Sequence, residues 1–366
     1  MNRDQIMVIY GDKPRKMVPE LLDAVGLAGE LKKEYTIGLK PNLVVARESS
    51  SGATTDPELV EAVVVYLKEH GFNNIVIMES SWVGDSTARA YRVCGYEEIS
   101  RKYDVPLVDL KRDDHRNIKV GDLTLKVCSR PLDVDYLINM PVLKAHCQTR
   151  LTCALKNLKG CIPDSEKRRF HTLGLHKPIA YLNAALKTHL TIVDGLLGDL
   201  TFEEGGTPVQ MNRIIAGKDP VLVDAYAAQL IGYDIDDIPY ISIAEQIGVG
   251  SADISGANIT ELNTDTYGQR SFKASRGYVS SLAAYIEDED ACSACYGSLI
   301  HALARLRERG MLSRLKGKKL YIGQGYKGRE GDGIGIGSCT RGFSTSLPGC
   351  PPKARDIVEF LEKLLV

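Results

Sequence analysis

Apolar positions in the first 250 residues follow two spacings, one typical of buried strands and one typical of amphipathic helices. After Asp56-Pro57, a dipeptide common at helix N-termini, apolar side chains recur every three or four residues up to Gly71. Short apolar runs at 36–39 and 75–78 lie on either side, and polar residues follow each of them. Strands that alternate with helices in this way form a mostly parallel sheet, so we expect an α/β fold with flanking helices.

The same alternation continues through the middle of the chain. Further strands are expected at 105–110, 136–138, 189–193 and 213–216, and further helices at 87–94 and after Asp219-Pro220. Several of these strands run directly into polar residues. In open α/β sheets the ligand lies beyond the carboxyl ends of the strands, so we expect a site at that edge of the sheet.

Composition divides the chain into three parts. Residues 1–250 form the predicted α/β core, and 251–290 form a predicted connector that begins with many Ser, Thr, Asn, Asp and Gly residues. Residues 291–366 form a predicted small α/β module with a helix at 299–309, a strand at 319–322, a glycine-dense loop and a final helix at 354–365.

Four cysteines in this last part stand in contexts typical of metal ligands. Cys292 and Cys295 form a close pair in ACSAC, Cys339 ends a glycine-rich run, and Cys350 stands in PGCPP. Thiolates are soft ligands that favour iron–sulfur clusters and zinc, and four of them match the needs of a 4Fe-4S cluster. Structural zinc usually takes two close pairs of ligands, and only one is present here. We therefore predict a 4Fe-4S cluster, with zinc or no metal as the alternatives.

The glycine-rich run before Cys339 lacks the strand-to-helix context and the Lys-Ser/Thr of phosphate-binding loops. We expect its backbone amides to donate to cluster sulfur atoms instead, since such hydrogen bonds tune the potential of a cluster.

A second informative stretch, from 139 to 171, is rich in basic and amide side chains. Its candidate ligand-binding residues are Lys144, His146, Lys156, Asn157, Lys159 and His171, and Lys40 and Asn42 add to them from an earlier strand end. Amines, amides and imidazoles of this kind suit phosphate or carboxylate groups, so we predict a site for a small anionic molecule. If residues 151–158 are helical, Thr152 and Lys156 lie one turn apart on the same face of that site. The alternative is a solvated basic helix face.

Three residues are candidates for acid–base chemistry at that site. Imidazole side chains ordinarily titrate near neutral pH, which makes His146 and His171 candidates, and Asp194 stands beside a glycine at a predicted strand end. Three further cysteines in the stretch, Cys147, Cys153 and Cys161, lack the spacing of a metal hook and are expected to be buried thiols, although a second metal is the alternative.

The composition indicates which cellular compartment and which binding partners to expect. Lys and Arg number 46 against 47 Asp and Glu, and the formal net charge of −1 argues against binding to nucleic acid or to an anionic membrane. The sequence shows no membrane-spanning apolar run and no signal-peptide pattern. Nine cysteines without a secretory signal are typical of reduced thiols and metal ligands. We expect a cytoplasmic protein, and an exposed cluster would suit an anaerobic host.

Four segments together resemble the bacterial and archaeal family called domain of unknown function 362. They are KPN at 40–42, TDPELVEA from Thr55, the block from Asn139 to Gly160 that ends in KNLKG, and IVDG followed by AGKDPVLVDA. The resemblance implies an α/β fold and no established reaction, and it implies an iron–sulfur association, because members often carry a ferredoxin-like module. This chain lacks the CxxCxxCxxxCP run of such a module. Its PGCPP element resembles the ligand loop of the terminal cluster in small subunits of respiratory NADH dehydrogenases.

These observations predict a cytoplasmic iron–sulfur protein that acts in electron transfer, or as an oxidoreductase on a small anionic molecule, with a redox partner protein. Two alternatives stay open. One is a non-redox enzyme acting on a phosphorylated or carboxylated substrate, with a structural cluster. The other is a protein that assembles or delivers clusters or metals. The sequence does not set the oligomeric state.

Overall fold

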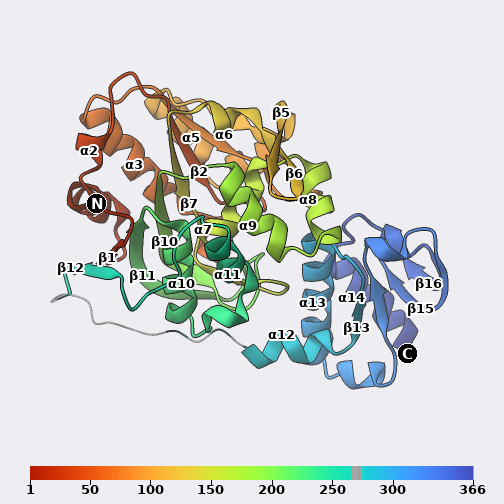
Figure 1. Ribbon diagram of the computed structural model, residues 1–366. Coiled ribbons are helices and arrows are strands. Elements are labelled where there is room, and N and C mark those ends of the chain that lie inside the picture. Colours follow the sequence, from red (N-terminus) through yellow and green to blue (C-terminus); the bar gives the residue numbers. More distant parts are fainter. Residues whose placement is uncertain (265–271, 273, 275, 366) are drawn as a thin grey trace. The chain divides into compact units, whose positions relative to one another are not determined.

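The computed structural model describes residues 1–264, 272, 274 and 276–365, which form two compact units (Figure 1). Unit 1 comprises Met1–Lys167 and His176–Ala274, and unit 2 comprises Arg168–Leu175 and Ser275–Val366. The predicted connector at 251–290 is divided between them, because β12 (Asn258–Leu262) pairs with β1 of unit 1. The rest of that range contributes α12 (Arg276–Ala283) and β13 (Ile286–Asp288) to unit 2.

Unit 1 is built on an eight-stranded sheet in the order β12-β1-β11-β10-β7-β2-β3-β4. Five neighbouring strands, from β10 to β4, are parallel, whereas β11 runs antiparallel to both of its neighbours. The strands are β1 (Gln5–Tyr10), β2 (Ile37–Pro41), β3 (Ile75–Glu79), β4 (Leu107–Asp109), β7 (Tyr136–Met140), β10 (Leu190–Asp199) and β11 (Pro208–Gly217). The mostly parallel sheet confirms the predicted α/β class.

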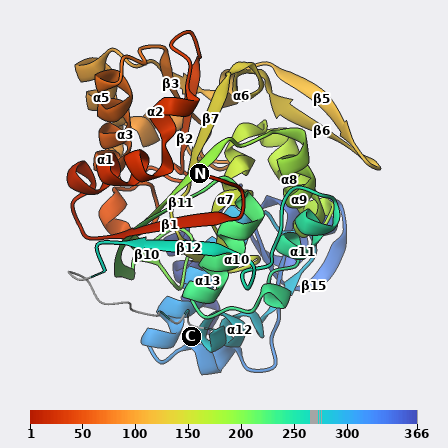
Figure 2. The same ribbon diagram turned by 60° about the vertical axis from the view of Figure 1, so that its left-hand side comes forward.

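Helices cover both faces of this sheet (Figure 2). One face is covered by α1 (Pro14–Val25), α2 (Leu27–Glu30), α3 (Pro57–Glu69), α4 (Thr87–Val93) and α5 (Tyr96–Tyr103), and the other by α7 (Ala154–Asn157), α9 (His176–Ala185), α10 (Pro220–Leu230) and α11 (Pro239–Gln246). The short α6 (Ser129–Asp133) and α8 (Asp164–Thr172) lie in connections. None of the helices in the described part of the chain has the length and apolar content needed to span a membrane.

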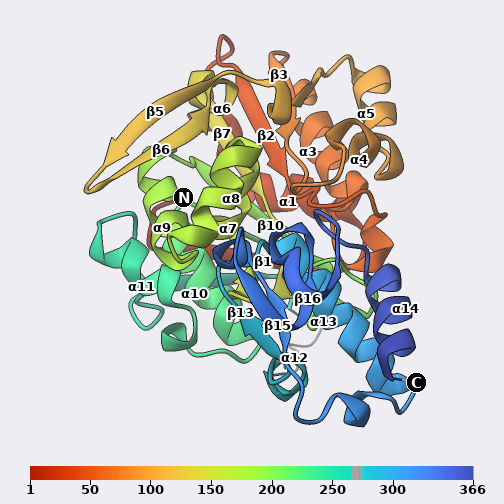
Figure 3. The same cartoon turned by 90° about the vertical axis from the view of Figure 1, so that its right-hand side faces the viewer.

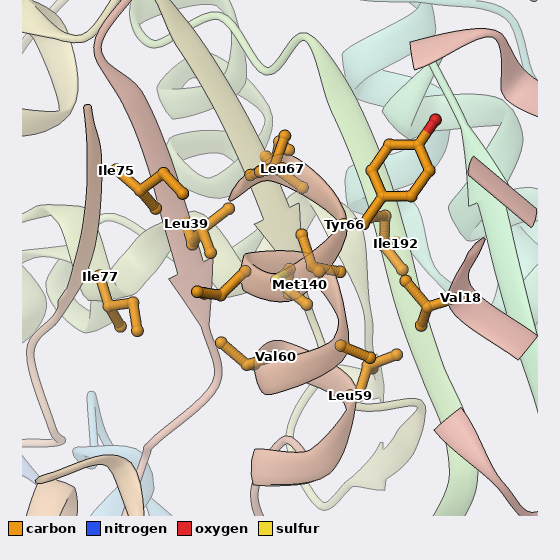
Figure 4. Close-up of a cluster of buried hydrophobic side chains, with 14 of the residues drawn as sticks. Val18, Leu39, Leu59, Val60, Tyr66, Leu67, Ile75, Ile77, Met140 and Ile192 are labelled. Carbon is orange, nitrogen blue, oxygen red and sulfur yellow. The ribbon is translucent and has the colours of Figure 1, made fainter. Parts of the chain in front are cut away.

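The first predicted helix, α3, shows how a start signal and an apolar stripe in the local sequence predict a helix. Asp56 Oδ1 accepts a hydrogen bond from Glu58 N at 2.8 Å, and Pro57 occupies the first turn of α3, as expected. The apolar stripe of α3, including Leu59 and Leu67, packs against Leu39 and other strand residues (Figure 4). Burying one such leucine contributes about 1.5–3 kcal/mol.

The stretch expected to be helical from 151 to 158 begins as a strand instead. β9 (Arg150–Thr152) pairs with β8 (Lys144–His146), and α7 begins only at Ala154. The buried carboxylate of Asp224 accepts hydrogen bonds from Ala154 N at 2.6 Å and Leu155 N at 3.2 Å, which fixes the start of the helix. A second hairpin, formed by β5 (His115–Val120) and β6 (Leu123–Cys128), projects as a long arm (Figure 3).

Unit 2 is a four-stranded parallel sheet in the order β13-β14-β15-β16. Its further strands are β14 (Leu320–Ile322), β15 (Glu330–Ile336) and β16 (Gly342–Leu347), and its long helices are α13 (Ser293–Glu308) and α14 (Ala354–Leu365) (Figure 3). The glycine-dense run that was expected to be a loop forms most of β15. A Cβ atom on Gly331 would lie 2.9 Å from the ring of Phe343, and one on Gly333 would lie 2.6 Å from that of Tyr321, so glycine lets these rings pack on the strand.

Candidate functional site

The carboxyl ends of β2, β3 and β7 bring buried polar side chains together in unit 1. Lys40 Nζ, at the end of β2, lies 2.5 Å from Glu79 Oε2, at the end of β3, and both side chains are buried. Asn157 Nδ2 donates to Asn139 Oδ1, at the end of β7, at 2.7 Å. Asn42 Nδ2 donates to Asn157 Oδ1 at 2.9 Å. The predicted residues Lys40, Asn42 and Asn157 therefore share one hydrogen-bonded network.

Gly160, the last residue of KNLKG, lies against this network. A Cβ atom there would be 1.8 Å from Glu79 Oε1 and 2.6 Å from Lys40 Nζ, so the ion pair leaves no room for a side chain. The carbonyl of Gly160 accepts a hydrogen bond from Ser80 Oγ at 2.8 Å, and Ser80 Oγ in turn accepts one from Lys167 Nζ at 2.6 Å. Burial lowers the pKa of Lys167 to about 8.

A second buried network contains Lys144, His146 and Lys156, all of them expected at a site. Lys144 Nζ donates to the carbonyls of Ala53 at 2.5 Å and Glu203 at 2.8 Å. The ring of His146 contacts the Glu203 carboxylate, and Lys156 Nζ lies 3.3 Å from Glu203 Oε2. Lys144 Nζ also lies 3.5 Å from the side-chain oxygen of Asn42, which belongs to the first network.

Hydrogen bonds fix the tautomer of His146. Its Nδ1 accepts the amide protons of Gln148 and Thr149, each at 3.1 Å, so in the neutral ring the proton lies on Nε2. The Nε2–H therefore faces the carboxylate of Glu203, which it contacts. This assignment makes His146 a hydrogen-bond donor whose Nε2 lone pair is not available to a metal.

Burial controls the charges of this network. It lowers the pKa of His146 to about 4 and that of Lys144 to about 7. Burial alone would raise the pKa of Glu203, but the neighbouring His146 and Lys156 hold it well below its ordinary value. At neutral pH the network therefore combines a neutral imidazole, an ionised Glu203 and a Lys144 amine that is partly deprotonated. Such a set can orient an anionic group and exchange a proton at Lys144 Nζ.

Three further predicted residues are Asp194, Lys159 and His171. Asp194 is buried, its Oδ2 accepts Asp56 N at 2.7 Å and its Oδ1 accepts Leu196 N at 3.0 Å, so it ties β10 to the start of α3. Burial, and then the charge of Asp56, raise the pKa of Asp194 to about 7. Lys159 is half-buried in the turn Leu158–Cys161. His171 belongs to unit 2, where Ser293 N donates to its Nε2 at 3.4 Å.

Glu203 and Asn139 complete the networks, and the sequence did not single out Glu203. It lies in the connection between β10 and β11, where the sequence EEGG carries no periodic pattern. The pair of acidic residues before two glycines was the only local signal. Cys153 and Cys161 are buried, and burial raises their pKa values, as expected for core thiols.

In unit 2, the four candidate ligand cysteines follow the carboxyl ends of three parallel strands. Cys292 is the N-cap of α13, after β13, and Cys295 lies in the first turn of that helix. Cys339 lies in the turn Ser338–Thr340, after β15, and Cys350 follows β16. Because the strands are parallel, these ends lie at one edge of the sheet, which we call the cysteine edge.

Hydrogen bonds hold the loops of the cysteine edge together. Ser338 N donates to the Gly349 carbonyl at 2.8 Å, and Gly349 N donates back to Ser338 Oγ at 3.1 Å, so the residues beside Cys339 and Cys350 are neighbours. Burial raises the pKa of the Cys295 thiol, and the proximity of the other three candidate ligands raises it further. Within the described residues, no three His, Cys, Asp or Glu side chains are grouped closely enough to form a ready-made metal site.

The family model described as "Domain of unknown function (DUF362)" matches residues 37–229. The chain belongs to this family. The DUF362 match contains both polar networks of unit 1, and the four cysteines of the cysteine edge lie outside it. Among the relatives of this DUF362 protein, a thylakoid-associated protein of Synechocystis is 26% identical over 246 residues, which are 63% of this chain and 73% of that protein.

Among solved structures, the lactate racemase apoprotein of Thermoanaerobacterium thermosaccharolyticum matches with a TM-score of 0.37 and 11% identity. The match spans 53% of this chain and 52% of the racemase chain, about half the length of each.

Proposed function

We propose that this DUF362 protein is a cytoplasmic 4Fe-4S iron–sulfur protein that acts in electron transfer or in the redox conversion of a small anionic molecule. The observation that supports the proposal is the position of four cysteines after the carboxyl ends of parallel strands, at one edge of the unit 2 sheet. They come from three separate segments of the chain. Thiols that bind no common ligand have no functional reason to lie at the same edge of a sheet. A bound 4Fe-4S cluster would supply one-electron transfer.

The residues at the cysteine edge fit this group in chemistry and in number. Four thiolates are soft donors that suit iron–sulfur clusters. Cys350 is exposed and the other three are half-buried, so the donors are accessible from outside unit 2. Since thiols must be deprotonated to bind a metal, loading would release a proton from Cys295, whose pKa is raised.

Unit 1 supplies groups for an anionic substrate. Lys144 and Lys156 supply amines for an anionic group, and His146 fixes the Glu203 carboxylate beside them. In the proposed function these side chains bind and orient the substrate, while Lys40, Asn42 and Asn157 keep the neighbouring strand ends in place.

A second function is favoured by the Lys144 amine, whose pKa near 7 suits proton transfer at neutral pH. Under this alternative the protein is a non-redox enzyme acting on a phosphorylated or carboxylated molecule, and the cluster is structural. The exposed Cys350 keeps a third role open, namely delivery of a cluster to another protein. A protein that turns over its substrate without iron would favour the enzyme, and one that transfers iron and sulfide to an acceptor would favour delivery.

The proposal is tested by counting metals in protein purified without oxygen. We expect about four irons and four sulfides per chain, with visible absorbance typical of a cluster. Cys339→Ser and Cys350→Ser should lose most of the iron, whereas Cys128→Ser, a matched change of a buried thiol in unit 1, should keep it. Zinc in place of iron, or no metal in the wild-type protein, would overturn the proposal. Fractionation of the native host cell tests the cytoplasmic location against the thylakoid association in the name of the Synechocystis relative.

A further inference from the structure

The connection 200–207, between β10 and β11, inserts a carboxylate among the basic side chains of unit 1. Glu203 is buried, Lys156 Nζ lies 3.3 Å from its Oε2, and the ring of His146 contacts the same oxygen. The backbone carbonyl of Glu203 accepts a hydrogen bond from Lys144 Nζ at 2.8 Å. All three partners are residues that the sequence predicts to bind a ligand. We call the space that the Glu203 carboxylate fills, between His146 and Lys156, the carboxylate seat.

The hydrogen bonds of Glu203 differ from those of the buried carboxylates that hold the fold together. Asp194, Asp199 and Asp224 each accept backbone N–H groups on both carboxylate oxygens. Among the described residues, the one hydrogen-bond donor to the Glu203 carboxylate is Lys156, and Oε1 is buried without a partner. A buried oxygen that lacks a donor costs about 1–3 kcal/mol. Glu203 is therefore easier to replace in its place than the other three carboxylates.

The backbone of the connection is held by bonds that do not involve the Glu203 carboxylate. Asp199 Oδ1 accepts Thr201 N at 2.7 Å and Oδ2 accepts Thr207 N at 2.8 Å, so one side chain closes both ends of the connection. Arg47 Nη1 donates to the carbonyl of the residue after Glu203 at 2.9 Å. Thr207 is exposed, so solvent lies close to this end of the connection. The Glu203 side chain can therefore turn out of the carboxylate seat while the backbone keeps its bonds.

The donors at the carboxylate seat suit a carboxylate better than a phosphate. Lys156 and His146 both face a single oxygen of the bound carboxylate. Lys144 Nζ is engaged by the carbonyls of Ala53 at 2.5 Å and Glu203 at 2.8 Å. A phosphate group would bury further oxygens there without donors, which is costly. A carboxylate from a ligand would make the contacts that Glu203 makes, and the exchange would leave the charge inside the network unchanged.

We propose that the carboxylate seat binds the carboxylate group of a small-molecule ligand, and that Glu203 occupies the seat while the ligand is absent. The inference rests on the anionic-substrate site of the proposed function and narrows its ligand to a carboxylate, and it does not depend on the cluster. Ligand binding turns the Glu203 side chain outward. The apparent affinity of the wild-type protein is therefore reduced by the fraction of molecules in which Glu203 fills the seat.

The experiment uses the full chain, with acetate as the carboxylate probe and inorganic phosphate as its competitor class. The test variant, Glu203→Ala, empties the carboxylate seat. The matched control, Glu20→Ala, removes the same charge from an exposed position on α1. A third variant combines Glu203→Ala with Lys156→Met, which removes a donor from the seat. Affinities are measured by calorimetry at constant ionic strength, and iron is counted in every sample.

We expect Glu203→Ala to bind acetate at least about tenfold more tightly than the wild-type protein and the control do, and at least about tenfold more tightly than it binds phosphate. The added Lys156→Met should remove this gain. Equal acetate affinities of Glu203→Ala and the control would overturn the inference, and so would phosphate binding as tight as acetate binding. Wild-type protein that binds no acetate at about a hundred times the dissociation constant of Glu203→Ala would overturn the displacement of Glu203.

Two further results keep the test decisive. If Glu203→Ala does not fold alone, its refolding is compared in acetate and in phosphate: recovery in acetate only supports the carboxylate seat, and no recovery in acetate refutes it. Wild-type protein without iron would overturn the cluster and leave the acetate measurement as it is, so a failure of the proposed function is distinguishable from a failure of the seat.

Discussion

Replacing Gly160 with alanine tests whether the buried Lys40–Glu79 pair defines the polar edge of unit 1. The added Cβ atom would lie 1.8 Å from Glu79 Oε1 and 2.7 Å from Lys40 Cε, so the two side chains cannot keep their places. The backbone of Gly160 does not have a positive φ, so the effect comes from this contact and not from backbone strain.

The expected loss of stability follows from the hydrogen bonds that the Glu79 carboxylate would lose. Glu79 Oε2 accepts hydrogen bonds from Lys40 Nζ at 2.5 Å and from Leu43 N at 3.2 Å, and both groups are buried. Disrupting a buried ion pair so that one charge loses its partner costs about 3–5 kcal/mol. We therefore expect Gly160→Ala to lower the free energy of unfolding of unit 1 by at least about 3 kcal/mol, a large share of the stability of an ordinary domain.

Urea unfolding followed by tryptophan fluorescence measures this change. The chain has a single tryptophan, Trp82, which lies in unit 1 close to Glu79, so the signal reports that unit. The matched control is Gly29→Ala, because a Cβ atom on Gly29 meets nothing within 4 Å. The control should unfold as the wild-type protein does or slightly later. Equal unfolding midpoints for the two variants would refute the close packing of Gly160 on the ion pair.

Three further predictions concern pH and the packing of unit 2. The pKa of Lys144 is lowered from 10.5 to about 7. Its contribution to the free energy of unfolding is therefore present above pH 10.5 and is lost as the pH falls toward 7. In urea unfolding, Lys144→Met should flatten this pH dependence. The pKa of Asp194 is raised from 3.8 to about 7. Its contribution to the free energy of unfolding is therefore present below pH 3.8 and is lost as the pH rises through 7. If Asp194→Asn leaves the slope of this free energy against pH unchanged, that would contradict the burial of Asp194. A Cβ atom on Gly335 would lie 2.7 Å from the Thr340 side chain, so Gly335→Ala should displace the turn that holds Cys339 and lower the iron content of the purified protein. Gly29→Ala, where the added Cβ atom meets nothing within 4 Å and φ is not positive, is its control for expression and handling, and iron contents that match in the two variants would count against that coupling.

Much of unit 1 could be predicted from the sequence because its signals are local. The Asp56-Pro57 start and the apolar stripe of α3 depend only on neighbours in the chain, as does the polar residue that follows each buried strand. For the same reason Lys40, Asn42 and Asn157 were expected at a site before their hydrogen bonds were known.

The remaining features depend on contacts between residues far apart in the sequence. Glycines usually indicate a loop, and β15 forms because Phe343 and Tyr321 occupy the space above its glycines. Residues 150–152 pair with β8, and Asp224 sets the start of the following helix from a position far along the chain. Glu203 reaches His146 only through the folding of the connection after β10, so no local pattern could mark it.

The central claim is that the cysteine edge holds a 4Fe-4S cluster. The most direct measurement is the low-temperature electron paramagnetic resonance spectrum of anaerobically purified, chemically reduced protein, with the spins counted per chain. We predict the signal of a reduced 4Fe-4S cluster at about one spin per chain, absent from Cys295→Ser and retained in Cys128→Ser. A wild-type protein that carries zinc, or iron with no cluster signal in either oxidation state, would contradict the account.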